Sequence, residues 1–221
     1  MAGTATGVGP LRRMPMQERS VARVQRMLDA CADLIDEVGY EGLTTTLLAE
    51  RAGVAIGSVY QFFPDKRAVV QALTMRNVEA YVSRVEARIN DGGPRHWVDV
   101  VEIAMDEYID MHRTIPGFRT LHFGDVVDTN LLDEERDNNA VIVDQLSRLL
   151  VGHFHLPAGP ALTFALARAV EMADALVKSA FRYQVDGDEA ILVEAKQIIR
   201  DYLARKLGTS AAEVAARHPA G

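Results

Sequence analysis

Apolar residues recur along this chain at intervals of three or four, the spacing that places them on one face of a helix. Such a stripe runs from Val21 to Val38 and is followed by Gly39, and glycine favours the left-handed conformation that ends many helices. We therefore predict a first helix that stops near Gly39. The single cysteine, Cys31, lies on this stripe and is interpreted as a small buried side chain rather than a redox sensor.

Two short helices joined by a tight turn are predicted next. The threonines at 44–46 supply an N-cap for the first of them, and Gly53 ends it. The second runs from about Ala55 to Phe62, before Pro64, because proline disfavours helical geometry in the residue that precedes it. A helix of two turns is unstable alone. We therefore expect packing on the neighbouring helix to hold it and to present its outer face rigidly.

Longer amphipathic segments fill the rest of the chain, separated by glycine- and proline-containing breaks at 91–94 and 116–117. No segment shows the alternation of a strand, and there is no internal repeat. Further helices are predicted over about 65–89, 97–111, 133–151, 161–183 and 188–207, with a short apolar segment at 118–123. The pattern predicts an all-α protein of about nine helices.

The composition places the chain among ordinary soluble proteins, with 48% hydrophobic and 25% charged residues. No apolar run reaches the roughly 18 residues that a membrane span requires. The segment Met1–Pro10 lacks the charged and apolar regions of a signal peptide. A single cysteine excludes an intrachain disulfide and suits a reducing compartment. We expect a cytoplasmic protein with no membrane partner.

The net charge of −7 is unevenly distributed, which matters for a nucleic-acid partner. Residues 1–70 hold eight basic and eight acidic side chains, so the excess negative charge belongs to the remainder. Residues 11–26 include five arginines and one acidic residue, Glu18. Such an arm either approaches phosphates or is an ordinary solvated tail; both interpretations stay open.

The most informative stretch is Leu43–Arg67, which has the pattern of a helix-turn-helix. Its small core is predicted from apolar positions in both helices, namely Leu48, Ala49, Ala52, Val54 and Val59. The outward face of the second helix carries Ile56, Gly57, Ser58, Tyr60 and Gln61. Small residues let a helix sit deep in a major groove about 12 Å wide, and glutamine can pair with an adenine edge.

This stretch resembles the DNA-binding domain of the TetR family of regulators. The family pattern is a threonine-led helix, an Ala-Gly-Val turn, a recognition helix ending in Tyr-x-x-Phe, and a lysine just after it. Here these positions are Thr45, 52–54, Tyr60, Phe63 and Lys66. The match covers about Val21–Leu73, a quarter of the chain; the rest resembles the family in length and helical character.

The resemblance implies DNA contacts for the matching positions. Phosphate contacts are implied for Thr45, Thr46, Tyr60 and Lys66, and base-edge contacts for Ala55, Ile56, Gly57, Ser58 and Gln61. Position 55 is often Ser or Thr in the family and caps the recognition helix there, which alanine cannot do. Simpler interpretations remain: Ser58 and Gln61 as solvated side chains, Tyr60 as a core residue, and Lys66 as an ordinary helix start.

The implied layout is an N-terminal three-helix DNA-binding domain and a larger C-terminal helical ligand-binding and dimerisation domain. The expected bounds are 1–17 for a disordered arm, 18–66 for the DNA-binding domain (helix-turn-helix about 44–63), 67–207 for the second domain and 208–221 for a flexible tail. The segment 161–183 is apolar on too many sides for a surface helix. A second subunit is one cover for it, and the core of a monomer is the other.

Candidate ligand contacts are aromatic, methionine and histidine side chains, which build pliable cavities, although each also fits an ordinary core position. They are Trp97, Tyr108, Met111, His112, Phe118, Phe123, Phe164 and Met172. Candidate dimer contacts are Leu166, Ala169, Val170, Ala173, Leu176, Val177, Ile198 and Tyr202. Glu171 and Asp174 either orient a ligand, form an interfacial ion pair or face solvent, and solvent exposure is the simplest of the three.

No nucleophile elbow, phosphate-binding loop, dinucleotide fingerprint or zinc-protease motif is present, so the sequence gives no support to an enzyme. His153 and His155 lack further ligands at zinc-site spacing, and we expect no metal and no cofactor. The sequence predicts a homodimeric repressor that a small, largely apolar effector releases from a palindromic DNA operator. A transcriptional activator or a ligand-independent DNA-binding protein of the same fold is the alternative.

Overall fold

The computed structural model describes residues 18–121 and 138–208. These residues form eight α-helices and no strand, which confirms the predicted all-α class and the approximate helix count. The predicted arm at 1–17, Phe123, and residues 209–221 of the predicted tail lie outside the described residues.

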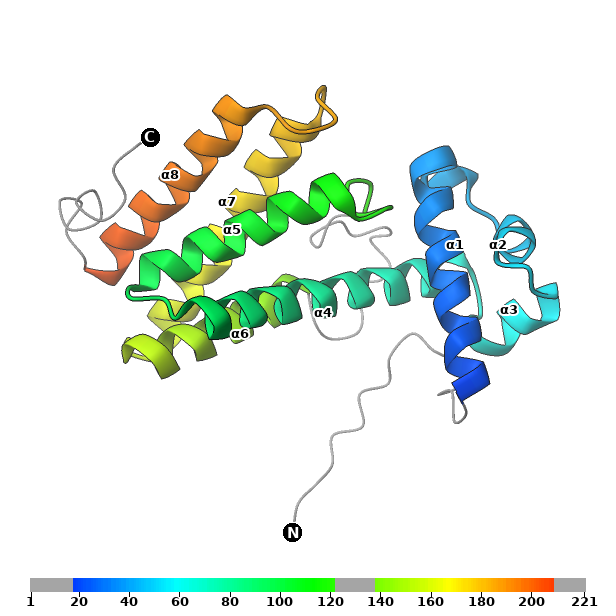
Figure 1. Ribbon diagram of the computed structural model, residues 1–221, viewed down its shortest axis with the longest axis horizontal. Helices are drawn as coiled ribbons and strands as arrows, with labels where there is room; N and C mark the ends of the chain where they lie inside the picture. Colours follow the sequence, from blue (N-terminus) through cyan, green and yellow to red (C-terminus); the bar gives the residue numbers. More distant parts are fainter. Residues whose placement is uncertain (1–17, 122–137, 209–221) are drawn as a thin grey trace, which may run out of the picture. The chain divides into compact units, whose positions relative to one another are not determined.

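The helices follow one another in the order drawn in Figure 1. Their bounds are α1 Glu18–Gly42, α2 Thr45–Ala52, α3 Ile56–Phe62, α4 Lys66–Gly92, α5 Trp97–Thr114, α6 Asn138–Phe154, α7 Pro160–Phe181 and α8 Glu189–Leu207. They divide into two compact units. The described part of the first unit is 18–77 and 116–121, and that of the second is 78–115 and 138–208, so α4 begins in one unit and ends in the other.

The first unit is built from α1, α2, α3 and the start of α4. Gly39 has φ 68°, which interrupts regular helical geometry near the end of α1 where the sequence predicted a stop. The side chain of Thr44 accepts a hydrogen bond from the Leu47 amide at 3.1 Å and caps α2. Gly53 ends α2 in the left-handed conformation with φ 63°. The cap and the stop of α2 are therefore as the sequence predicted.

A distant segment, residues 116–121, also belongs to the first unit and packs on α1. The carboxylate of Asp36 accepts hydrogen bonds from the Gly117 amide at 2.7 Å and from the Thr120 hydroxyl at 3.0 Å. Phe118 is buried, and the backbone of Gly117 lies close to that of Ala32. The segment is thus held by side-chain hydrogen bonds, by a buried ring and by close backbone packing.

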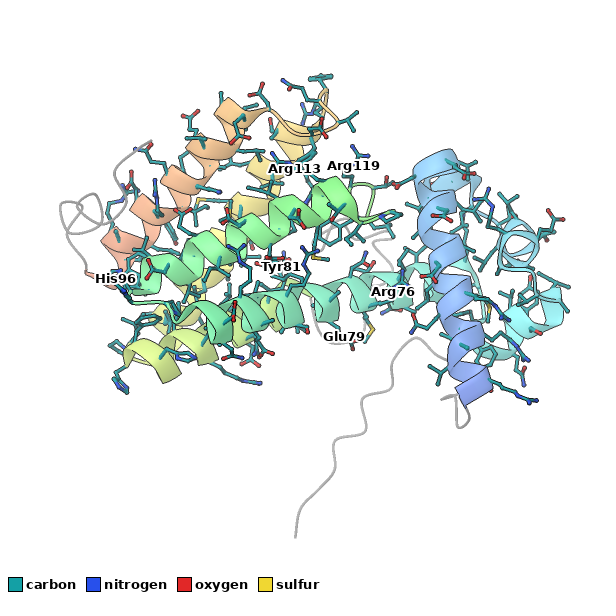
Figure 2. The ribbon with its side chains drawn as sticks, in the orientation of Figure 1. Arg76, Glu79, Tyr81, His96, Arg113 and Arg119 are labelled. Atoms are coloured by element: carbon teal, nitrogen blue, oxygen red, sulfur yellow. The ribbon has the colours of Figure 1, made fainter. Side chains whose placement is uncertain are left out.

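The second unit is a helical layer in which α7 packs against both α6 and α8, and α5 contacts all three. The start of α5 is fixed by His96, labelled in Figure 2, whose ring accepts a hydrogen bond from the Val98 amide at 3.3 Å. The Asp99 carboxylate accepts from the His96 amide at 2.8 Å and completes a reciprocal cap. Arg84 of α4 donates to Glu107 of α5 at 2.6 Å, which ties these helices together.

Replacing Gly117 with alanine tests the close packing on α1. Gly117 has φ +74°, and an added Cβ would lie 2.9 Å from Ala32 Cα, which is backbone and cannot move aside. We expect Gly117→Ala to lower the free energy of unfolding by about 1–3 kcal/mol, measured by urea titration. Gly57→Ala is the control, because its Cβ would meet nothing within 4 Å on a helical backbone. Equal stability of the Gly117→Ala variant and the unsubstituted protein would contradict this packing.

Candidate nucleic-acid interface and cavity

The α2–α3 pair is held by a short turn and a small core. The Gly53 amide donates to Glu50 O at 3.2 Å, and the Val54 amide donates to Ala49 O at 3.0 Å. The core side chains predicted from sequence are buried except Val54, which is partly exposed; the buried ones are Leu48, Ala49, Ala52 and Val59. Phe62 and Phe63 are buried as well. Helix α3 has seven residues, so this packing rather than its own hydrogen bonds keeps it folded.

The opposite face of α3 is exposed. Ile56 and Tyr60 retain 41% and 46% of their accessible surface, and Ala55, Gly57 and Gln61 are also exposed, with Ser58 partly so. Ala55 precedes α3 in an extended conformation and gives it no side-chain cap, as expected for alanine. The residues that the sequence assigned to base edges therefore lie together on one accessible surface.

A hydrogen bond joins the two helices at the edge of this surface. The Thr45 Oγ1 atom lies 3.0 Å from the Tyr60 hydroxyl oxygen. Thr45 begins α2, Tyr60 is in the last turn of α3, and Thr46 is exposed. Hydroxyl groups both donate and accept hydrogen bonds. The two hydroxyl groups can therefore donate hydrogen bonds to an anion, and the hydrogen bond between them orients the Tyr60 phenol.

Lys66 binds the end of α1. Its ammonium donates to Tyr40 O at 3.0 Å and to Glu41 O at 3.5 Å, and it lies 4.4 Å from the centre of the Tyr40 ring. A cation near the last carbonyls of a helix complements the helix dipole. Sequence reasoning did not find this role, because the two contacts join residues more than twenty positions apart. A phosphate contact by Lys66 stays a prediction.

A bidentate ion pair connects α2 to α1. Arg51 donates to the two carboxylate oxygens of Glu37 at 2.8 and 2.6 Å. The hydrogen bond from Arg51 lowers the pKa of Glu37, and the same bond raises that of Arg51. Arg76 similarly donates to Asp29 at 2.6 Å and joins α4 to α1. The charged side chains on the outside of α1 thus orient its neighbours.

The second unit encloses a cavity between helices α4 to α8. Its empty space, including the space at the mouth, is about 630 Å³. The wall is mainly aliphatic, with a few polar side chains. Its residues are Tyr81, Val100, Val101, Ala104, Met105, Tyr108, Asn139, Ile142, Leu146, Leu150, Leu166, Ala169, Val170, Ala173, Asp174, Ile199 and Leu203. A mainly apolar wall with a few polar side chains is typical of small-molecule sites.

The candidate ligand residues are dispersed in the structure. Tyr108 lines the cavity. Trp97, Met111 and His112 are buried in the second unit but do not line it, and Phe118 is buried in the first unit. Phe164 is 60% exposed and Met172 partly exposed. Most of the wall consists of Val, Leu, Ile and Ala at helical spacing, and no sequence signal distinguishes such residues from ordinary core.

The candidate dimer residues divide between the cavity and the surface. Leu166, Ala169, Val170 and Ala173 line the cavity, and Val177 is fully buried within the chain. Leu176 and Tyr202 are partly exposed, and Ile198 is exposed. Phe164, Val193 and Ile198 are large apolar side chains exposed on α7 and α8.

Comparison with known proteins gives two family matches that together span both units. Residues 27–73 match the bacterial regulatory proteins of the tetR family, and residues 95–207 match the tetracyclin repressor-like C-terminal domain. The chain belongs to the TetR family of bacterial transcriptional regulators. A TetR-family regulator from Streptomyces coelicolor is 42% identical, with a TM-score of 0.72 over 83% of this chain and 98% of that one.

Curated TetR-family relatives match over shorter stretches. BetI, an HTH-type transcriptional regulator from Klebsiella pneumoniae, is 34% identical over 34% of this chain and 40% of its own. The class A tetracycline repressor protein of transposon 1721, from Escherichia coli, is 49% identical over 21% of this chain and 22% of its own. The chain therefore spans less than half the length of these relatives. Among the described helices, none is long and apolar enough to cross a membrane.

Substituting Lys66 with methionine separates its contact with α1 from any contact with DNA. The variant keeps the aliphatic stem but loses the hydrogen bonds to Tyr40 O and Glu41 O. We expect the free energy of unfolding to fall by about 1–2 kcal/mol in urea titrations. Arg26→Met is the control, because Arg26 is exposed on α1 and no ion pair joins it to another described residue. A Lys66→Met protein as stable as the Arg26→Met protein would rule out the anchoring role.

Proposed function

We propose that this TetR-family protein is a transcriptional repressor that a small, largely apolar effector releases from a palindromic operator. The observation that carries the proposal is the exposed face of α3, held against a buried core and bordered by the Thr45–Tyr60 hydroxyl pair. A helix that is rigid on one side and accessible on the other is what the major groove accepts.

Within this proposal, the outward side chains of α3 read base edges. Ala55 and Gly57 are small enough to let the backbone approach the bases closely. The exposed side chain of Ile56 is apolar, and apolar groups contact the methyl of thymine. Gln61 can pair with adenine, and Ser58 with either kind of base. The thymine contact by Ile56 would make α3 selective without any charged side chain.

Phosphate contacts surround this reading surface. Thr45, Thr46 and Tyr60 offer hydroxyl donors, and Lys66 remains a candidate donor beyond its contact with α1. Such contacts position a protein on the duplex and carry no sequence information. The Thr45–Tyr60 hydrogen bond would prepare both hydroxyls for one phosphate before binding.

Two copies of the chain would bind one operator. The exposed apolar side chains of Phe164, Val193 and Ile198 on α7 and α8 support a second copy as the cover of these helices. A two-fold dimer matches two half-sites roughly 34–36 Å apart. The effector would occupy the cavity of the second unit, and by linkage it must bind the DNA-free form more tightly than the DNA-bound form.

A fluorescence-anisotropy titration with duplex from upstream of the protein's own gene tests DNA binding. Tyr60→Phe removes one hydroxyl that both Thr45 and a phosphate would share, so we expect affinity to fall by about three- to tenfold. The melting temperature should change little, because the hydrogen bond lost to Thr45 is exposed to water and Tyr60 is half-exposed. Tyr183→Phe, at a tyrosine that is 89% exposed in the second unit, is the control.

The same titrations at several salt concentrations should show affinity that falls steeply as salt rises, because phosphate contacts release counterions. Unchanged affinity of the Tyr60→Phe protein would contradict the proposed phosphate contact. Binding no tighter than to random duplex, with the unsubstituted protein, would count against this operator.

A further inference from the structure

An acidic side chain lies in the otherwise apolar wall of the cavity. Asp174 is on α7, the side chain retains 14% of its accessible surface, and it is one of the residues that line the cavity. Among the described residues of the wall it is the one with a charged side chain. Removing a carboxylate from water is costly unless it is paired and hydrogen-bonded. The Asp174 carboxylate therefore needs a hydrogen-bonding partner at this position, and its presence in an apolar wall calls for a functional explanation.

Two side chains compensate for the burial of Asp174. The Tyr108 hydroxyl donates to Oδ1 at 2.6 Å, and the Lys178 ammonium lies 3.0 Å from Oδ2, one turn further along α7. Tyr108 lines the cavity together with Asp174, whereas Lys178 does not. Tyr108 and Asp174 thus bring a phenol oxygen and a carboxylate to the wall, and both of these groups accept hydrogen bonds.

The Tyr108 phenol is itself fixed in place. His112 is 1% exposed, its Nδ1 is 2.8 Å from Tyr108 O, and its ring meets the Tyr108 ring edge-on with centroids 4.5 Å apart. Tyr81 also packs edge-on against the Tyr108 ring, with centroids 5.9 Å apart, and donates its hydroxyl to Ala104 O at 3.1 Å. Figure 2 labels Tyr81, on α4. The Tyr108–Asp174 pair is thus held by buried neighbours on two helices.

An exposed ion pair elsewhere on α7 shows how Asp174 differs from an ordinary surface carboxylate. Arg168 and Glu171 of α7 form an ion pair whose side chains are 47% and 48% exposed, and neither residue lines the cavity. Such a pair contributes little and faces water. Asp174 is more buried than Glu171 and belongs to the wall of an otherwise apolar cavity, which is where a group that orients a ligand is expected.

We propose that the cavity binds an apolar molecule with a hydrogen-bond-donating head, an amine or a hydroxyl, and that Asp174 and Tyr108 bind that head. The Asp174 carboxylate accepts from Tyr108 and pairs with Lys178, and because each of its oxygens has two lone pairs, a donor head adds to these contacts without breaking them. An anionic head would bring like charge to Asp174 in a largely apolar site. Calling this ligand the effector rests on the proposed function, whereas the preference for a donor head does not.

Three probes with the same chain and different heads test the proposal: octylamine, 1-octanol and octanoate. Isothermal titration calorimetry with the full chain should show binding of the amine and the alcohol. Octanoate should bind at least about tenfold more weakly than octylamine, the scale of one charge-assisted hydrogen bond. No binding of octylamine, or octanoate binding as tightly as octylamine, would overturn the proposal.

Asp174→Asn keeps the shape of the side chain and removes its charge. We expect octylamine to bind about tenfold more weakly to this variant and the gap to octanoate to close. Glu171→Gln, which removes a carboxylate from the exposed side of α7, should leave all three affinities unchanged. An unchanged ranking of the three head groups in the Asp174→Asn protein would overturn the assignment to Asp174. The comparison of head groups on the unsubstituted protein tests the proposal even if this variant does not fold.

The same probes separate the ligand site from the regulatory role. Addition of octylamine to the protein–DNA complex should lower anisotropy if the cavity ligand is an effector. Octylamine that binds with the expected head preference but leaves DNA affinity unchanged would uphold the site and contradict the regulatory part of the proposed function.

Discussion

The seven-residue length of α3 is the constraint on which the DNA-binding unit depends. A helix of this length does not persist alone in water, so its position is set by what it buries. Val59, Phe62 and Phe63 are that buried side, and Leu48 and Ala49 of α2 belong to the same small core. The exposed side is then fixed as a consequence. The proposed base contacts of Ser58 and Gln61 therefore depend on the buried core that holds α3 in place.

Short-range features of this unit could be predicted from sequence because they depend on local chemistry. Thr44 caps α2, Gly53 ends it and Ala55 leaves α3 uncapped, all from residue types whose backbone preferences are strong. The stop near Gly39 follows for the same reason. Amphipathic spacing likewise placed the other long helices to within about three residues of their ends, whereas the predicted start at 133 lies outside the described residues.

Contacts between distant residues could not be predicted in this way. Nothing near Lys66 indicates that its ammonium binds Tyr40 O, and nothing near Gly117 indicates that its amide binds Asp36. The wall of the cavity is made of Val, Leu and Ile residues whose spacing is the same as that of core residues. The chemistry of an aromatic side chain such as Phe164 makes it a candidate ligand contact. Its exposure, however, depends on which face of the helix the rest of the fold covers.

The course of the chain connects the two units more than once. Helix α4 begins at Lys66 in the first unit and carries Tyr81, which lines the cavity in the second. Helix α5 carries Tyr108 and leads directly into residues 116–121, which pack on α1. Two helices that border the cavity are therefore continuous with elements of the first unit. The release by an effector that we propose would use this continuity of the chain.

The most direct test of this account is selection of bound duplexes from a random library by the full chain. A dimer that presents two α3 helices predicts enrichment of one inverted repeat, with half-sites roughly 34–36 Å apart. Enrichment of no sequence over the input library would contradict the account, because the proposed base contacts of α3 require a sequence preference.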